Sequence, residues 1–202
     1  MKITHFSSNY NGLSELFGLP AVGKTTFLET TTQYFNINDS NNKKAIKRHI
    51  LKILSFFYVL CFEFVFFKDA ARFVVQSKLF LRDRLRLFLN LLRVKRESLK
   101  YSGQNMMSDQ GFLQAVWSVS VFSSLKKDKM ANVLLDFMKN NQNTFPKHVV
   151  VLEEGFSVIL EHELKRYGKL GNYYANKSRQ ERAIYFQSII MDIVRKYYTL
   201  GK

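Results

Sequence analysis

The segment Gly18-Leu19-Pro20-Ala21-Val22-Gly23-Lys24-Thr25 has the residue types and spacing of a phosphate-binding loop, the Walker A motif. Glycines at both ends of the loop let the backbone turn closely around an anion, so that successive N–H groups point inward. Lys24 adds a mobile positive charge near the β- and γ-phosphates, and the Thr25 hydroxyl is a ligand for Mg²⁺. We therefore predict that residues 18–25 and Thr26 bind the phosphates of ATP or GTP, with Lys24 also acting in catalysis.

The residues around this loop predict the elements that would position it. The apolar run 13–17 leads directly into the loop, as a buried strand entering a turn would, and residues 25–30 can begin a helix. A strand, a glycine loop and a helix form the context that a phosphate-binding loop requires. A helix that begins beside Lys24 would add the positive end of its dipole to the site.

Two further strands are predicted to end in carboxylates. A turn at Ser102-Gly103 and a short apolar stretch precede Ser108-Asp109-Gln110-Gly111, so a buried strand can deliver Asp109 to its end. Residues 148–154, His-Val-Val-Val-Leu-Glu-Glu, are typical of a buried, β-branched strand with carboxylates at its carboxyl end.

Most of the remaining sequence predicts helices. Residues 36–44 are polar and rich in turn formers, which favours an exposed loop. Residues 45–100 contain no proline or glycine and predict at least two helices, with a break near Lys68-Asp69. Apolar stripes predict the later helices, over residues 112–125, 127–141, from about 157, and 177–198, the last with Ala183, Phe186, Ile190, Val194 and Tyr197 on its buried face.

Three regions, Gly18 to Leu28, Ser108 to Gln114 and Val149 to Tyr197, resemble the P-loop kinases of the nucleotide-kinase group, particularly thymidylate-kinase-like proteins. The resemblance implies an α/β, three-layer P-loop NTPase fold, with a parallel sheet of about five strands and helices on both faces. It implies one domain over residues 1–202. Within that domain, residues 45–100 would form a helical acceptor-binding region, and residues 166–178 would form a lid.

The resemblance also implies that Arg166, Arg179 and Arg182 close over the phosphates, with Arg166 and Arg182 catalytic and Arg179 binding the nucleotide. A guanidinium binds phosphate oxygens bidentately, and such an arginine can raise the rate about 10³-fold or more. Asp109 would match the carboxylate that serves Mg²⁺ or accepts the proton of the attacking hydroxyl. Thymidylate kinases usually have an arginine after this aspartate, whereas Gln110 follows it here. A sugar, another small alcohol or a protein hydroxyl is therefore as plausible an acceptor as a nucleotide.

These residues favour an ATP-dependent kinase that uses Mg²⁺ and phosphorylates a small molecule. One alternative is an ATP- or GTP-hydrolysing switch, in which Glu153 and Glu154 supply the second carboxylate motif. Another is a basic nucleic-acid-binding protein, which the charge alone suggests. Scattered histidines, a single cysteine and the lack of a Gly-x-Ser-x-Gly motif give no support to a zinc site or to covalent catalysis.

The formal charge of +15 over 202 residues would attract phosphates, nucleic acid or an anionic membrane surface. The stretch between Lys68 and Lys100 contains ten basic and three acidic residues, which we interpret first as a solvated helix face.

The apolar run Ile53 to Phe67 has 15 residues and contains Glu63, so a buried helix is expected, with a membrane-associated helix as the alternative. Cys61 within it is expected in the core. The N-terminal residues lack a secretory signal, which favours a cytoplasmic location, and a dimer is allowed.

Overall fold

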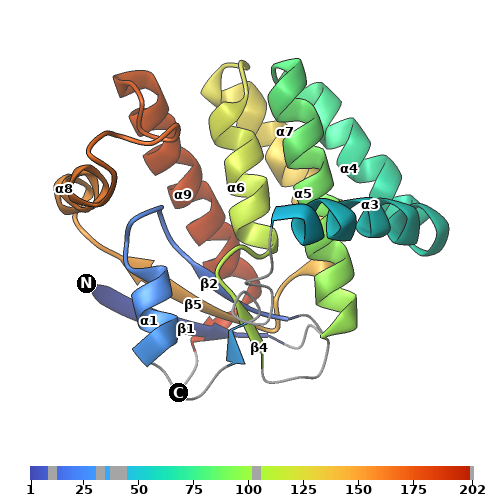
Figure 1. Ribbon diagram of the computed structural model, residues 1–202, viewed down its shortest axis with the longest axis horizontal. Coiled ribbons are helices and arrows are strands. Elements are labelled where there is room, and N and C mark those ends of the chain that lie inside the picture. Colours follow the sequence, from blue (N-terminus) through green and yellow to red (C-terminus); the bar gives the residue numbers. More distant parts are fainter. Residues whose placement is uncertain (9–12, 31–34, 37–44, 102–105, 201–202) are drawn as a thin grey trace.

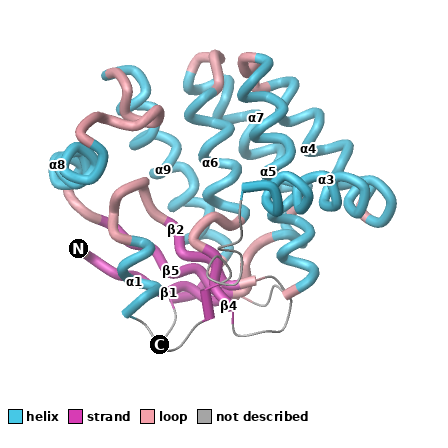
Figure 2. Tube along the Cα trace, viewed as in Figure 1, coloured by secondary structure: helices cyan, strands magenta, loops and turns pink. Residues whose placement is uncertain are grey.

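One mixed sheet lies beside a larger group of helices (Figures 1 and 2). The computed structural model describes residues 1–8, 13–30, 35–36, 45–101 and 106–200. Within them the sheet has the strand order β3-β4-β2-β5-β1-β6. Its strands are β1 (Lys2–Ser7), β2 (Ser14–Phe17), β3 (Phe35–Asn36), β4 (Met106–Ser108), β5 (His148–Glu153) and β6 (Thr199–Leu200).

The centre of the sheet is parallel and one edge is antiparallel. β2 pairs in parallel with both β4 and β5, and β3 pairs in parallel with β4. β1 runs antiparallel to β5 over its whole length, with Lys2 opposite Glu153, and β6 runs antiparallel to β1. The three strands predicted around residues 13–17, 106–108 and 148–154 are confirmed, whereas β1, β3 and β6 were not predicted, and Asn36 lies in β3 instead of the expected loop.

The predicted parallel, three-layer P-loop fold with helices on both faces is therefore wrong. Residues 2–7 enter beside β5 in the opposite direction, which makes the sheet mixed. The chain is also predominantly helical, and Figure 1 shows most of the helices gathered on one side of short strands. Long helical connections within residues 45–141 fill the space over that side of the sheet.

The helices account for most of the core. Asn176 caps α9 because its side-chain oxygen accepts a hydrogen bond of 3.0 Å from Arg179 N. α6 is buried along its whole length, and the Trp117 indole N–H within it donates to Ala183 O of α9 at 3.0 Å. The helices are α1 (Lys24–Thr30), α3 (Ala45–Phe62), α4 (Phe64–Gln76), α5 (Leu81–Lys100), α6 (Phe112–Phe122), α7 (Lys127–Asn140), α8 (Phe156–Tyr167) and α9 (Lys177–Tyr197).

The predicted helices after residue 110 are confirmed, including the buried stripe of α9, on which Tyr197 is partly exposed. The predicted break at Lys68-Asp69 is wrong, because that pair lies inside α4 and the helices separate at Glu63 and at residues 77–80. Most of the predicted 36–44 loop and the Ser102-Gly103 turn lie outside the described residues.

The segment Ile53 to Phe67 is not the single buried helix that was predicted. It divides between α3 and α4, where the chain bends by 118°, and Cys61 is exposed rather than in the core. An apolar run shows that a helix can be buried, but only packing decides which side is covered. Among the described residues no single helix is long and apolar enough to cross a bilayer, although Ile50–Phe62 and Phe64–Gln76 would pass that test as a bent pair.

A buried carboxylate joins the sheet to α6. Glu15 of β2 accepts hydrogen bonds from Leu113 N at 2.9 Å and Gln114 N at 2.8 Å, in the first turn of α6. Gly111 makes this approach possible, because a Cβ at that position would lie 2.5 Å from the Glu15 carboxyl carbon. Burial raises the pKa of Glu15 from 4.5 to about 7, against the lowering effect of the amide donors and of Lys24.

This pKa predicts how stability depends on pH. The native state holds the Glu15 proton more tightly than the unfolded chain does. Protonated Glu15 therefore stabilises the fold fully below pH 4.5, and this stabilisation is lost as the pH rises to about 7. Relative to Glu15→Gln, which does not titrate, the unmodified chain should lose up to about 3 kcal/mol of unfolding free energy across this range. Chemical denaturation of both proteins at pH 5 and pH 7.5 measures the difference. Equal pH dependence in the two would show that Glu15 remains ionised in the fold.

Candidate nucleotide-binding site

The loop from Gly18 to Thr25 follows β2 directly and turns back over the end of β5. A Cβ at Gly18 would lie 2.7 Å from the carbonyl oxygen of Leu152, so only glycine fits this contact without displacement. Ala21 and Gly23 have positive φ values of 65° and 96°, which bend the chain into a tight loop. Val22 N donates to Leu19 O at 3.3 Å within the turn. The loop therefore has the local curvature that close approach to an anion needs.

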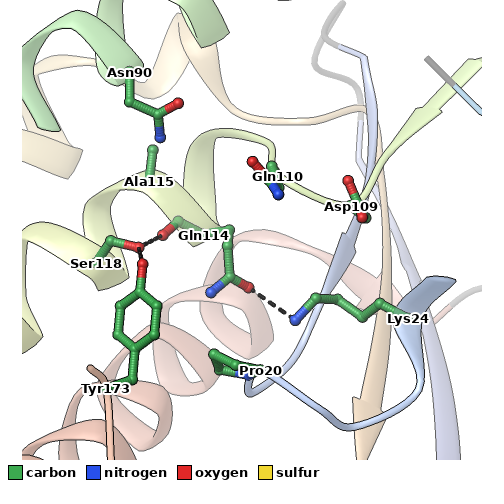
Figure 3. Close-up of a pocket in the computed structure, with 9 residues that line it drawn as sticks. All are labelled: Pro20, Lys24, Asn90, Asp109, Gln110, Gln114, Ala115, Ser118 and Tyr173. Atoms are coloured by element: carbon green, nitrogen blue, oxygen red, sulfur yellow. Dashed lines mark hydrogen bonds between the residues drawn. The ribbon is translucent and has the colours of Figure 1, made fainter. Parts of the chain in front are cut away.

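Lys24 places its ammonium group inside this loop. Its Nζ donates to Gly18 O at 2.6 Å, to Leu19 O at 3.1 Å and to Gln114 Oε1 at 3.3 Å (Figure 3). Burial lowers the pKa of Lys24 from 10.5 to about 8, although Asp109 and Glu15 both act to raise it. The Lys24 ammonium is thus partly desolvated, and its pKa of about 8 lies close to neutral pH.

A large cleft opens on one side of Lys24. Its volume is about 760 Å³, within the range of about 300–1,000 Å³ typical of small-molecule sites. Predicted site residues from three distant parts of the sequence line it together, namely Lys24 and Thr25, Asp109, and Arg166. Of the other predicted loop residues, Ala21, Val22, Gly23 and Thr26 also line it.

One face of α8 supplies much of the positive charge of the cleft. His162, Lys165 and Arg166 all line it, and their spacing of three and four residues puts them on the same side of the helix. Their neighbour Glu163 is instead buried and accepts a hydrogen bond from Gly171 N at 3.2 Å. Only Arg166 was predicted. The i, i+3, i+4 pattern of basic residues is the sequence signal that would have identified His162 and Lys165.

A smaller pocket opens on the other side of Lys24 and Asp109. Its volume is about 230 Å³. Figure 3 shows its side chains converging from the glycine loop and the start of α1, from the turn after β4, from α5 and α6, and from the segment after α8. Ser118 Oγ donates to Gln114 O at 2.9 Å and lies 3.2 Å from the Tyr173 hydroxyl. The lining residues are Pro20, Lys24, Asn90, Asp109, Gln110, Gln114, Ala115, Ser118 and Tyr173. Among the side chains described in the predicted acceptor region 45–100, only Asn90 lines this pocket.

Lys24 and Asp109 belong to both cavities. The strand order explains this, because β4 and β5 flank β2 and all three run in the same direction. Their carboxyl ends therefore deliver the loop, Asp109 and the Glu153-Glu154 pair to one edge of the sheet. The Glu15 bond to α6 fixes the position of Gln114 at the same edge.

Arg182 does not line either cavity. It is buried on α9, and its guanidinium donates to Ser120 O at 2.7 Å, Leu125 O at 2.8 Å and Val121 O at 3.2 Å. These carbonyls lie at and just beyond the C-terminal end of α6, where a cation is favourable. The geometry gives Arg182 a role in packing α9 against α6.

The predicted lid is fastened to the body of the protein. The hydroxyl of Tyr174, a buried residue, donates to Pro20 O in the loop at 3.0 Å. Arg179 donates to Asn172 O at 2.7 Å and lies over the Phe122 ring, so it holds this segment in place and does not line the cleft. The segment 168–176 thus works as a strap that connects α8, the loop and α6.

The two acids of the alternative motif lie beside β1. Glu154 Oε2 is 2.8 Å from the Met1 amino group, whose hydrogen bond lowers the pKa of Glu154, and Glu153 is 3.9 Å from Lys2 Nζ. Glu154 lines the large cleft, whereas Glu153 does not. In the described part of the chain, no three His, Cys, Asp or Glu side chains gather as a metal site would need. Mg²⁺ would depend on Thr25 and Asp109, which are oxygen donors suited to it, together with phosphate oxygens.

Replacement of Arg182 and of Arg166 by alanine should change the free energy of unfolding by different amounts. Arg182→Ala leaves three carbonyls without their donor and opens space in the core, so the free energy of unfolding should fall by about 3 kcal/mol. Arg166→Ala removes an exposed side chain and should change it by less than about 0.5 kcal/mol. Urea denaturation of both variants tests this contrast. A stable Arg182→Ala protein would contradict the structural role of that guanidinium.

No protein-family model, no curated protein and no solved structure matches this chain. The function of the site must therefore be inferred from its own geometry and chemistry.

Proposed function

We propose that this protein transfers the terminal phosphoryl group of a Mg²⁺-bound nucleoside triphosphate to a hydroxyl of a small, uncharged molecule. The observation that carries the proposal is the meeting of two cavities at Lys24 and Asp109. One cavity has the glycine loop and the basic face of α8, which suits a triphosphate. The other has amides and hydroxyls, which suit an acceptor.

The donor side combines several groups that bind phosphate. The loop offers backbone N–H groups in a tight turn, and Lys24, Lys165 and Arg166 add positive charge around the cleft. His162 borders the same space. Mg²⁺ bound by the Thr25 hydroxyl and phosphate oxygens, and served by Asp109 through a coordinated water, would neutralise charge on the phosphates. Together these groups outnumber the acids Asp109 and Glu154, so the cleft favours a polyanion.

Asp109 is suited to handle the proton during transfer. In the proposed step the acceptor oxygen forms a bond to the terminal phosphorus, and the bond from that phosphorus to the bridging oxygen breaks. The nucleoside diphosphate leaves with the bridging oxygen, and the acceptor proton passes to the Asp109 carboxylate. Lys24 faces both cavities and stabilises negative charge on the transferring group. Arg166 can do the same from α8.

The lining of the smaller pocket indicates the class of acceptor. Apart from Lys24 and Asp109, it consists of uncharged residues, among them Asn90, Gln110 and Ser118. The nearby Arg93 is held by both Glu97 oxygens, at 2.9 and 2.8 Å, and by Asn90 Oδ1 at 3.0 Å. Because that guanidinium is neutralised, no basic group other than Lys24 is set to hold an acceptor phosphate among the described lining residues.

The size of the pocket leads to the same conclusion. A volume of 230 Å³ corresponds to about seven or eight water molecules at about 30 Å³ each. Amide and hydroxyl side chains that surround such a space can exchange several hydrogen bonds with a compact polyhydroxylated compound. A small sugar or polyol therefore fits better than a nucleoside monophosphate, which carries a phosphate and is larger.

Binding of the nucleotide should depend on the charge of Lys24. Lys24→Ala should weaken binding of Mg²⁺-ATP at least about tenfold, because a charge-assisted hydrogen bond contributes about 1.5–3 kcal/mol. In the unmodified protein, affinity should decrease as the pH rises through about 8, where the free Lys24 loses its proton. Titration calorimetry with ATP and GTP from pH 6.5 to 9 measures both effects. Lack of nucleotide binding by the unmodified protein would refute the proposal.

Turnover should require the acceptor. We expect slow hydrolysis of ATP alone, with clear acceleration by at least one neutral sugar or polyol and none by nucleoside monophosphates. Tyr173→Phe should raise the acceptor KM about three- to tenfold, with unchanged ATP affinity, because it removes one pocket hydroxyl. Steady-state kinetics across a panel of acceptors tests this. Rapid hydrolysis without acceptor that Glu154→Gln abolishes would favour the hydrolysing switch instead.

A further inference from the structure

The outer side of α3 is an exposed apolar ridge, formed by Ile50, Ile53, Leu54, Phe57, Tyr58, Cys61 and Phe62. These positions recur at intervals of three and four residues, so they form one continuous face of the helix. The ridge continues around the bend into α4, where Phe64 is 60% and Val65 is 71% exposed, next to Phe62 at 74%. Contiguous apolar patches of this kind on a protein surface mark binding sites for other proteins or for membranes.

The fold does not need this face for its own packing. The opposite side of α3 carries the contacts, with Ser55 and Val59 buried. The Phe56 ring meets the Phe67 ring of α4 at 5.4 Å, and Phe67 meets the Phe88 ring of α5 at 5.4 Å. Figure 1 shows α3 crossing α5 and extending away from the sheet. The ridge is therefore held rigidly from behind and directed outward.

The charges beside the ridge are basic. Lys68 and Arg72 are exposed and follow Phe64 at intervals of four, so they continue the same face along α4. The only acids between residues 50 and 76 are Glu63 and Asp69, and both are engaged inside. Glu63 lies 3.4 Å from the buried Lys95 ammonium, and Asp69 accepts a hydrogen bond of 3.4 Å from Asn141 Nδ2. The face thus combines bulky apolar side chains with positive charge that no acid among the described residues neutralises.

We propose that this ridge docks onto a membrane surface that carries anionic lipid. The helix α3 would lie along the interface with its apolar face among the acyl chains, and Lys68 and Arg72 would contact the headgroups. The bend at Glu63 puts Phe62, Phe64 and Val65 at the corner, where they can enter most deeply. Charge complementarity selects this occupant, because a second copy of a chain with a net charge of +15 would bring like charges together.

The single cysteine allows a direct test on the unmodified sequence. Cys61 lies within the ridge, is exposed, and is the only cysteine in the chain, so a polarity-sensitive fluorophore can be attached there alone. Vesicles of phosphatidylcholine with phosphatidylglycerol should shift its emission to the blue. Pure phosphatidylcholine vesicles should do so at least about tenfold less effectively, and added salt should weaken the response. Duplex DNA should leave the emission unchanged.

Matched variants distinguish binding through the ridge from non-specific hydrophobic adsorption. In vesicle sedimentation, the double change Phe57→Ser with Phe62→Ser should weaken binding at least about tenfold. Leu135→Ser with Ile184→Ser is the control, since both residues are 44% exposed on other helices. The double change Lys68→Gln with Arg72→Gln should weaken vesicle binding about fivefold for each charge removed. Lys129→Gln with Lys139→Gln has the same net charge and should lose less. Circular dichroism and urea denaturation verify that every variant remains folded.

Three results would overturn the proposal. The first is the absence of an emission shift with anionic vesicles at low salt. The second is equal loss of vesicle binding in the ridge variant and its Leu135/Ile184 control. The third is a dimer in sedimentation equilibrium that the Phe57/Phe62 variant converts to a monomer, which would assign the ridge to contacts between copies of this chain.

Discussion

The hydrogen bonds from Leu113 N and Gln114 N to the Glu15 carboxylate are the interaction on which the rest of the site depends. They connect β2, which leads into the glycine loop, with α6, which follows Asp109. A change in this connection would move Asp109 and Gln114 relative to Lys24. Gly111 is part of the same constraint, because any larger residue would occupy the space of the carboxyl group. Burial of an acid in this position has a cost, visible in its raised pKa.

The loop is held from its other side as well. Gly18 packs against the Leu152 carbonyl of β5, and the Tyr174 hydroxyl bonds to Pro20 O, so both neighbours of the loop limit its movement. Such rigidity keeps polar groups oriented before a ligand arrives, which is the condition for strong electrostatic stabilisation. It also explains why the two cavities share Lys24 and Asp109, since Lys24 begins α1 at the end of the fixed loop and Asp109 directly follows β4.

The sequence allowed the loop and the central strands to be predicted because their signals are local. Glycines, a lysine and runs of β-branched residues depend little on distant contacts. The direction of β1 beside β5 has no such signal, since the alternation of apolar and polar residues along a strand does not determine which strand it pairs with. Arg166 and Arg182 show the same limit at the site. Both are arginines near helix ends, yet only packing reveals that Arg182 satisfies the carbonyls of α6 while Arg166 borders the cleft. Cys61 was wrongly expected in the core because the sequence of a largely apolar helix does not show which of its faces is buried.

The distribution of charge connects the two proposals without making one depend on the other. The basic residues of α8 surround the cleft, whereas Lys68 and Arg72 lie along the ridge on α4. In Figure 1, α8 and the outer end of α3 stand at opposite sides of the molecule. A protein resting on a membrane through α3 would therefore keep the cleft open to nucleotide from solution. Because fields from exposed charges decay within about 8–10 Å in physiological salt, each basic region can attract its own anion independently of the other.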